Sequence, residues 1–236
     1  MVKQRALLSW SSGKDSAWAL HRVLKEGKLD VVGLLTTINA THERVAMHAV
    51  RTELLRAQAA SAGIPLWEVA IPSPCSNAEY EHAMGLAMER AKAEGIEVMI
   101  FGDLYLEDVR AYREEKLAPT GISPYFPLWK QPTDKLAREM IDGGLVAHIT
   151  TVDPKQAPHC LVGRVFDHAF LADLPPGVDP CGENGEFHSF VSAGPMLKTP
   201  LQVHVGELVL REGFQFADLL LAPTDSPTAS HNQPSS

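Results

Sequence analysis

The sequence predicts an α/β fold, in which a mostly parallel sheet has helices on both faces and is followed by a smaller α+β domain. Strand-length apolar runs alternate with segments of helical periodicity over the first hundred residues. After residue 104, prolines at positions 119, 124, 127 and 132 interrupt a shorter and less regular set of elements. The chain has 236 residues and is 45% hydrophobic, enough for one large or two small domains. We therefore place the domains at residues 1–104 and 105–222.

The first hundred residues alternate strands and helices in a regular order. The predicted strands are residues 6–10, 31–38, 66–71 and 98–101. The predicted helices run to about residue 26 and over residues 49–62 and 77–94, the last two ended by Gly63 and Gly95. Strands that alternate with helices imply right-handed crossovers and a Rossmann-like parallel sheet. Ligands of such sheets bind beyond the carboxyl ends of the strands.

The second part of the chain has shorter elements. We predict helices at residues 107–117 and 133–142, a strand at 146–152, and a helix-like segment at 165–171. Two further apolar runs, at residues 202–210 and 214–221, complete the ordered part. The tail, residues 223–236, is rich in Pro, Ser, Thr and Asn, which predicts disorder.

A phosphate-binding loop is predicted directly after the first strand, at residues 11–16, and is called the phosphate loop below. Its sequence is Ser11-Ser12-Gly13-Lys14-Asp15-Ser16. The start of the following helix offers unpaired N–H groups, the small side chains let a polyphosphate approach, and Lys14 adds a cation. The loop is not a Walker A motif, because Leu8 stands where that motif has its first glycine. A simple capped turn would explain the serines but not Gly-Lys-Asp together.

The phosphate loop resembles the pyrophosphate loop of the adenine nucleotide alpha-hydrolase group, whose signature is Ser-Gly-Gly-x-Asp-Ser. The chain departs from that signature at Ser12, which stands where the middle glycine is expected. Glycine adopts left-handed backbone conformations most easily. We therefore expect the backbone at Ser12 to avoid such a conformation.

Charge and cysteine content limit the classes of partner. The formal net charge of −8 disfavours a broad nucleic-acid footprint, and no stretch has the roughly 18 apolar residues of a membrane span. The three cysteines, Cys75, Cys160 and Cys181, are far apart, which favours free thiols over a disulfide framework or a zinc ribbon. We expect a cytoplasmic protein without nucleic-acid or membrane partners.

A second dense group of polar residues lies at 181–188, with the sequence Cys-Gly-Glu-Asn-Gly-Glu-Phe-His. Two carboxylates, a thiol and an imidazole lie within eight residues, and two glycines allow sharp turns. The spacing does not match a closed zinc site. The alternative is a glycine-rich hairpin in which Glu183 and Glu186 are only solvated.

Four motifs in order give the chain a resemblance to the diphthine-ammonia ligase family, over about residues 6–221. They are the phosphate loop, Gly-Asp…Glu-Asp…Arg at 102–110, Pro-Leu-Trp at 127–129, and the group at 181–188. The resemblance implies an enzyme that uses ATP and Mg²⁺ to amidate a carboxylate with ammonia through an acyl-adenylate, releasing AMP and pyrophosphate. The implied substrate is diphthine on elongation factor 2 where the host makes it, and another small carboxylate where it does not.

The resemblance and the positions of polar residues at strand ends suggest a set of site residues. The nucleotide-binding candidates are Ser11, Ser12, Gly13, Lys14, Asp15, Ser16, Thr36, Thr37 and Gly102, with Asp15 also holding the metal. The catalytic candidates are Lys14, Asp15, Asp103, Glu183 and Glu186. The substrate-binding candidates are His48, Glu107, Arg110, Gly182, Glu183, Asn184, Gly185, Glu186 and His188.

Other functions stay open at this point. A nonenzymatic module could use ATP or AMP to regulate a partner, and it would tolerate replacement of Glu183 or Glu186. A tRNA-thiolating enzyme often has a paired Cys-x-x-Cys and a basic RNA surface, neither of which is found here. A glutamine-dependent synthetase would need a separate glutaminase domain, so free ammonium is the simpler nitrogen source.

Overall fold

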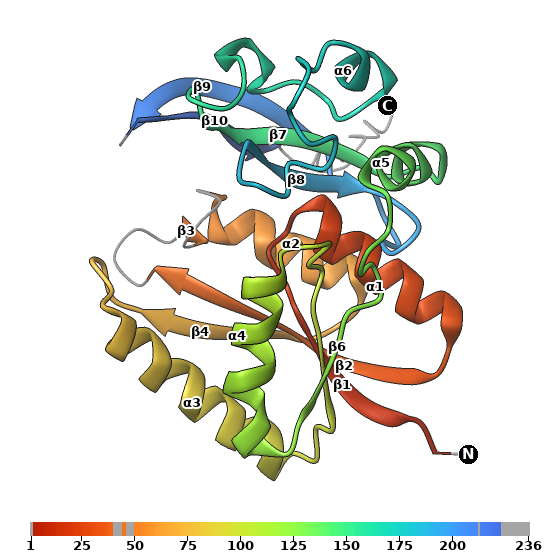
Figure 1. Cartoon of the computed structure of the whole chain (residues 1–236), viewed down its shortest axis with the longest axis vertical. Coiled ribbons are helices and arrows are strands. Elements are labelled where there is room, and N and C mark those ends of the chain that lie inside the picture. Colours follow the sequence, from red (N-terminus) through yellow and green to blue (C-terminus); the bar gives the residue numbers. More distant parts are fainter. Residues whose placement is uncertain (1, 40–43, 46–49, 212, 223–236) are drawn as a thin grey trace, which may run out of the picture.

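The computed structural model describes residues 2–39, 44–45, 50–211 and 213–222. Figure 1 shows a parallel sheet with its helices in the lower part of the molecule and an antiparallel sheet above it. The predicted α/β class and the Rossmann-like parallel sheet are confirmed. His48 and the tail predicted to be disordered lie outside the described residues.

The first sheet contains five parallel strands in the order β4-β2-β1-β5-β6, and a short strand β3 pairs antiparallel with β2. The strands are β1 (Gln4–Ser9), β2 (Leu29–Asn39), β3 (Arg44–Val45), β4 (Leu66–Ile71), β5 (Val98–Ile100) and β6 (Ser123–Tyr125). Along the chain, β2 and β4 are added on one side of β1, and β5 and β6 are then added on its other side. The carboxyl ends of β1 and β5 therefore flank the crevice where such sheets bind ligands.

Two pairs of helices cover the two faces of this sheet. They are α1 (Lys14–Glu26) with α2 (Thr52–Ala62), and α3 (Asn77–Ala93) with α4 (Glu107–Leu117). Neighbouring residues of β1 point to opposite faces, as the pleat of a strand requires. Leu8 packs in the core with Trp18 of α1 and Leu54 of α2. Leu7 packs in a second core that includes Met88 of α3 and Leu117 of α4.

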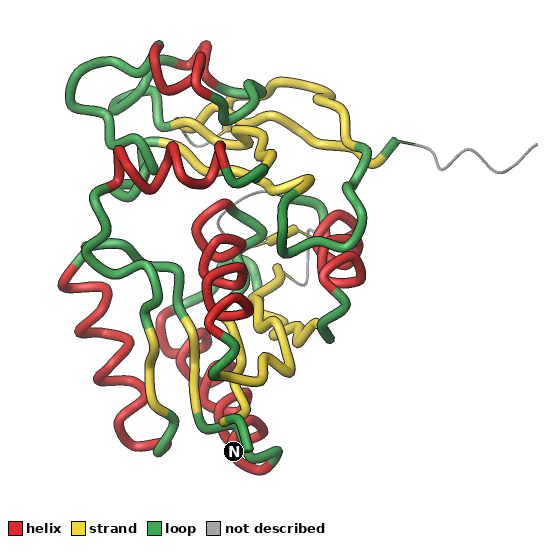
Figure 2. The backbone as a smooth tube through the Cα atoms, turned by 90° about the vertical axis from the view of Figure 1, so that its right-hand side faces the viewer, coloured by secondary structure: helices red, strands yellow, loops and turns green. Residues whose placement is uncertain are grey.

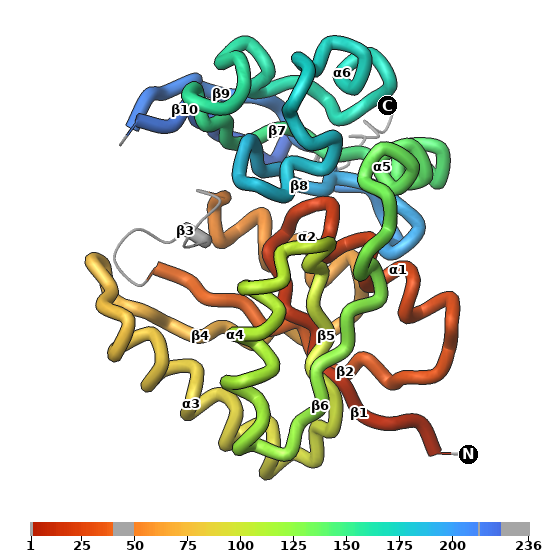
Figure 3. Tube along the Cα trace, viewed as in Figure 1, coloured from red at the N-terminus to blue at the C-terminus, as the bar shows by residue number. Residues whose placement is uncertain are grey.

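The second sheet is antiparallel, with the strand order β8-β7-β10-β9. Its strands are β7 (Val146–Val152), β8 (Phe187–Ala193), β9 (Val203–Arg211) and β10 (Phe214–Leu221). Helices α5 (Thr133–Asp142) and α6 (His168–Ala172) and the 3₁₀ turns Ala118–Thr120 and His159–Leu161 complete the described elements. Figure 3 follows the chain from β6 up to α5 and into this sheet.

The two sheets share one hydrophobic core. Phe187 and Phe190 of the second sheet belong to the same buried cluster as the residues between the first sheet and α1. The side view in Figure 2 also shows the antiparallel sheet above the parallel one. The antiparallel sheet with α5 and α6, called the second domain below, therefore packs on the α1 and α2 side of the parallel sheet, which leaves the α3 and α4 side to a separate core.

Strand β6, which was not predicted, and the start of α6 differ from the sequence prediction for physical reasons. Pro124 lies within β6, which forms the edge of the sheet and, among the described strands, pairs only with β5, so a missing N–H is tolerated there. The prediction of a helix-like segment from residue 165 is wrong at its start, because Val165 bridges to His148 in extended form. Helix α6 begins only at residue 168, where the Asp167 carboxylate caps it by accepting from the Phe170 N–H.

The parallel sheet continues past residue 104 and ends at Tyr125, so the division of the chain at residue 104 stays a prediction. None of the helices in the described part of the chain combines the length and the apolar character that crossing a bilayer requires.

Candidate functional site

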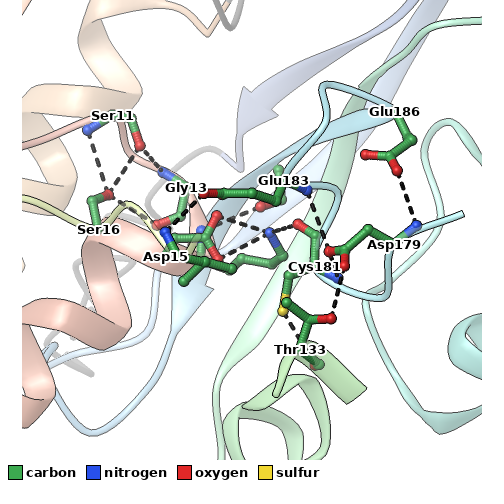
Figure 4. Close-up of polar contacts among 12 residues, drawn as sticks. Ser11, Gly13, Asp15, Ser16, Thr133, Asp179, Cys181, Glu183 and Glu186 are labelled. Carbon is green, nitrogen blue, oxygen red and sulfur yellow. Dashed lines mark hydrogen bonds and ion pairs between the residues drawn. The ribbon is translucent and has the colours of Figure 1, made fainter. Parts of the chain in front are cut away.

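The phosphate loop joins β1 to α1 and is held by its own hydroxyl groups (Figure 4). The Ser11 and Ser16 hydroxyl oxygens lie 3.0 Å apart, and the Ser16 hydroxyl donates to the Gly13 carbonyl at 3.0 Å. The Gly13 N–H donates to Ser11 Oγ at 3.3 Å. Gly13 is the N-cap of α1 and provides no side-chain cap, so the helix start keeps the polarity that attracts anions.

Ser12 has a left-handed backbone, with φ of 67°. The expectation that serine would move this position away from a glycine-like conformation is therefore wrong. Two hydrogen bonds fix the Ser12 carbonyl, which accepts from the Val191 N–H at 3.0 Å and from Gln58 Nε2 at 3.0 Å. A strained residue persists where its surroundings determine its conformation in this way.

The second domain closes over the phosphate loop through β8. The Lys14 N–H donates to Ser189 Oγ at 3.2 Å, and Lys14 Nζ donates to the carbonyl of Cys181. A Cβ on Gly13 would lie 3.1 Å from the Ser189 carbonyl oxygen, so glycine permits this close approach. On the other side, a Cβ on Gly102 would lie 2.9 Å from the Ser16 nitrogen. The loop is thus enclosed by backbone from both domains.

Lys14 is a buried cation in this site. Its side chain is 3% exposed, and Nζ lies 2.9 Å from the Asp15 carboxylate and 5.4 Å from the centre of the Phe187 ring. Burial alone would lower the pKa of Lys14, but the nearby acidic groups, chiefly Asp15, together outweigh this and raise it above its ordinary value. The neighbouring Cys181 thiol is neutral, because burial raises its pKa. A buried fixed positive charge suits the binding of a polyphosphate.

Glu186 organises the segment that faces Lys14, residues 179–188. Its buried carboxylate accepts hydrogen bonds from the Asp179 N–H at 2.9 Å and from the Asn184 N–H at 2.9 Å. Gly182 within this segment has φ of 69°, and a Cβ there would lie 2.8 Å from the Phe187 carbonyl oxygen. The two carboxylates of the segment therefore do more than contact solvent, because Glu186 fixes the shape of the turn and Glu183 reaches the first domain.

Glu183 joins the two domains at the crevice. Its Oε1 accepts from the Leu104 N–H at 2.7 Å and from the Tyr105 N–H at 3.2 Å, just beyond β5. Burial raises the pKa of Glu183 to about 7, although these two hydrogen bonds act in the opposite direction. Tyr105 adds a second link, since its hydroxyl donates to Asn184 Oδ1 at 3.1 Å.

Of the other predicted site residues, His188 lies next to Ser189 on β8, whereas Asp103, Glu107 and Arg110 contact residues outside the phosphate loop. Burial lowers the pKa of His188, on β8 beside Ser189, to about 4. Both oxygens of Asp103 accept hydrogen bonds from Arg113, at 2.7 and 3.0 Å. Among the contacts of the described residues, Glu107 pairs with Lys130 at 2.8 Å, and the Arg110 guanidinium stacks on Phe126 and Trp129.

A cavity of about 570 Å³ lies between the carboxyl edge of the sheet and helices α3 and α4. Thr36 and Thr37, two of the predicted nucleotide contacts, line it together with Ser11. The helical wall was not predicted, although Tyr80, Met84 and Met88 repeat every four residues and so share one face of α3. The volume falls in the range of small-molecule sites, roughly 300–1,000 Å³.

Comparison with known proteins gives matches over both domains. Residues 3–122 match the family described as diphthamide synthase N-terminal domain, and residues 132–218 match diphthamide synthase C-terminal domain. The chain is 24% identical to a rat diphthine–ammonia ligase over 232 residues, which cover 88% of this chain and 85% of the rat protein. It is 30% identical to the human diphthine–ammonia ligase over 142 residues, or 56% of this chain and 50% of the human protein.

Proposed function

Because the chain belongs to the diphthamide synthase family, we propose that it uses ATP to amidate a carboxylate with ammonia, with protein-bound diphthine as the acceptor. The observation that carries this proposal is the enclosure of the phosphate loop by β8 and residues 179–188. A nucleotide sensor would need the loop, but it would have little use for a half-buried glutamate, Glu183, held beside it by the other domain.

The proposed position of ATP follows from the loop and the cavity beside it. The base and ribose fill the cavity lined by Thr36, Thr37 and the α3 wall, and the phosphates lie at the start of α1. Ser11 is part of both regions, because it lines the cavity and bonds within the loop. Lys14 then stabilises the negative charge that develops on the departing pyrophosphate.

The residues present fit Mg²⁺ only if the nucleotide supplies most of the ligands. Among the described residues, no three His, Cys, Asp or Glu side chains are grouped as a metal site. Mg²⁺ commonly binds one or two carboxylates together with phosphate oxygens. Asp15, which lies in the loop and is paired with Lys14, is the carboxylate we assign to it. The ion would neutralise phosphate charge there.

The proposed reaction has two steps. An oxygen of the substrate carboxylate attacks the α-phosphorus of ATP, and the bond to the pyrophosphate oxygen breaks. Ammonia then attacks the carbonyl carbon of the acyl-adenylate, the bond to AMP breaks, and one proton is released. Glu183 has a pKa of about 7, so it is suited to accept that proton near neutral pH.

The remaining polar groups of residues 179–188 are assigned to the substrate. Asn184 follows Glu183 in the turn, and His188 lies on β8, the strand that follows this turn. Glu186 is assigned a positioning role, because its oxygens are engaged by the backbone of Asp179 and Asn184.

The experiment that tests the function is phosphorus NMR of the products. The protein is incubated with MgATP and ammonium, with elongation factor 2 carrying diphthine and, separately, with a panel of small carboxylates. We expect AMP and pyrophosphate only when an acceptor is present. Asp15→Ala should abolish this activity, whereas Asp30→Ala, on the exposed start of β2, should retain it.

Three other outcomes would contradict parts of the proposal. ADP and phosphate as products would exclude the adenylate. Product formation with a small carboxylate but not with diphthine would exclude the assigned acceptor. Bound ATP that no acceptor consumes, together with full function after replacement of Glu183, would favour a sensor.

A further inference from the structure

We propose that Gln58 of α2 is a positioning residue that holds the phosphate loop in its binding shape. The inference rests on the proposed function only in that the loop binds the phosphates of ATP. Gln58 is fully buried, with 0% of its surface exposed, and lies opposite the loop on the α1 and α2 side of the sheet. A buried amide of this kind requires a partner for each polar atom.

The side-chain amide of Gln58 makes three hydrogen bonds to three different parts of the molecule. Its Oε1 accepts from Trp10 Nε1 at 3.0 Å, at the end of β1. Its Nε2 donates to the Ser12 carbonyl at 3.0 Å and to the Val191 carbonyl of β8 at 2.5 Å. One side chain therefore ties the first strand, the phosphate loop and the second domain together.

Only an amide of this length satisfies all three partners. Trp10 Nε1 is a donor and needs an acceptor, whereas the carbonyls of Ser12 and Val191 need donors. Glutamate would place a negative charge against the two carbonyls, and methionine would leave all three groups without this partner. The orientation of the amide is fixed as well, because the indole N–H can bond only to Oε1.

Ser12 explains why the loop needs such a support. A left-handed conformation is strained for a residue other than glycine. The Ser12 carbonyl is held by Gln58 and by the Val191 N–H, and Val191 is itself bonded through its carbonyl to Gln58. This triangle keeps the strained backbone in place and sets the direction of the following Gly13 and Lys14 N–H groups.

The chain offers a matched control on the same helix. Ser61 lies one turn after Gln58, is also buried, and also bonds across to the second domain. Its hydroxyl donates to the Thr199 carbonyl at 2.6 Å and accepts from the Thr199 N–H at 3.2 Å. Ser61→Ala therefore weakens a contact between the domains without touching the phosphate loop.

Amide hydrogen exchange in the absence of nucleotide tests the inference directly. In Gln58→Met we expect the Gly13 and Lys14 amides to exchange at least tenfold faster than in the wild type, and in Ser61→Ala we expect them unchanged. Circular dichroism establishes that each variant is folded. Unchanged exchange of these two amides in folded Gln58→Met, or equal acceleration in Ser61→Ala, would overturn the positioning role.

Binding of a non-hydrolysable MgATP analogue gives a second readout. We expect Gln58→Met to weaken binding about tenfold and Ser61→Ala less than twofold. Adding Ser12→Gly to Gln58→Met should restore part of the affinity, because glycine adopts the loop conformation at lower cost. If Ser12→Gly restores no affinity, the inference is contradicted. If the wild type binds no analogue but the two variants still show the exchange pattern described above, only the proposed function is contradicted.

Discussion

At the scale of single residues, Ser12 has the backbone conformation that a glycine would adopt with less strain. Its hydroxyl is buried and has no hydrogen-bond partner among the described residues. We predict that Ser12→Gly is about 0.5–1 kcal/mol more stable than Ser12→Ala, because relief of the left-handed strain exceeds the entropy that glycine adds to the unfolded chain. Urea unfolding measures the difference. Equal stability of the two variants would show that Ser12 is not strained.

Glu183 and His188 give opposite pH dependences of stability. The pKa of Glu183 is raised from 4.5 to about 7, so its stabilising contribution is complete below pH 4.5 and is lost as the pH rises to about 7. The pKa of His188 is lowered from 6.5 to about 4, so its contribution is complete above pH 6.5 and is lost as the pH falls to about 4. Between pH 4.5 and 6.5 the two effects oppose each other.

Replacing one of the two groups exposes the effect of the other. We predict that the free energy of unfolding of the wild type minus that of Glu183→Gln decreases as the pH rises from 4.5 to about 7, and is constant above that range. The glutamine keeps an oxygen for the Leu104 and Tyr105 N–H groups, so the comparison isolates the titration. A difference that does not change with pH would show that the pKa of Glu183 is ordinary.

The residues that sequence could identify are those that lie close together along the chain. Lys14, Asp15 and Glu183 were identified from local motifs, and the structure brings Lys14 and Asp15 within 2.9 Å of each other. Gln58 and Ser189 contact the same loop, but they lie 46 residues and more away from it in the sequence. A single glutamine in an amphipathic helix carries no local signal of such a contact.

At the scale of elements, the junction of α1 and α5 depends on a glycine. A Cβ on Gly143, at the end of α5, would lie 2.4 Å from the Trp18 ring of α1. Its φ of −77° is open to any residue, so the effect of Gly143→Ala is steric. We predict a loss of about 1–3 kcal/mol in the free energy of unfolding.

Gly85 provides the matched control for this prediction. It lies inside α3, and a Cβ there would meet nothing within 4 Å. Gly85→Ala should therefore gain about 0.5–1 kcal/mol from helix propensity. If both alanine variants change stability in the same direction, the packing of Trp18 on Gly143 is not the cause.

Strands with unusual composition were the elements that sequence did not reveal. The edge strand β6 contains Pro124, which predicts irregular structure when its position in the sheet is unknown. Strand β8 follows the glycine-rich turn directly, and nearly all its residues are buried, so it shows no alternation of apolar and polar positions. Helix α4 and strand β7, by contrast, were predicted with their observed bounds.

At the scale of the whole molecule, the shared core predicts that the two domains unfold together. Trp18 belongs to the cluster that joins α1 to the second sheet, and Arg51 makes a bidentate ion pair with Asp218 of β10, at 2.7 and 3.0 Å. We predict that tryptophan fluorescence and far-ultraviolet circular dichroism report the same urea transition. Two separate transitions would show that the domains are independent.

The central claim is that the enclosed phosphate loop activates a carboxylate by adenylation. The most direct measurement uses diphthine labelled with ¹⁸O in its carboxylate, together with unlabelled MgATP and ammonium. The account predicts that one ¹⁸O atom appears in the phosphate of AMP, visible as an isotope shift in its phosphorus NMR signal, and that Asp15→Ala gives no AMP. Amide formed with unlabelled AMP, or with the label in inorganic phosphate, would contradict the account.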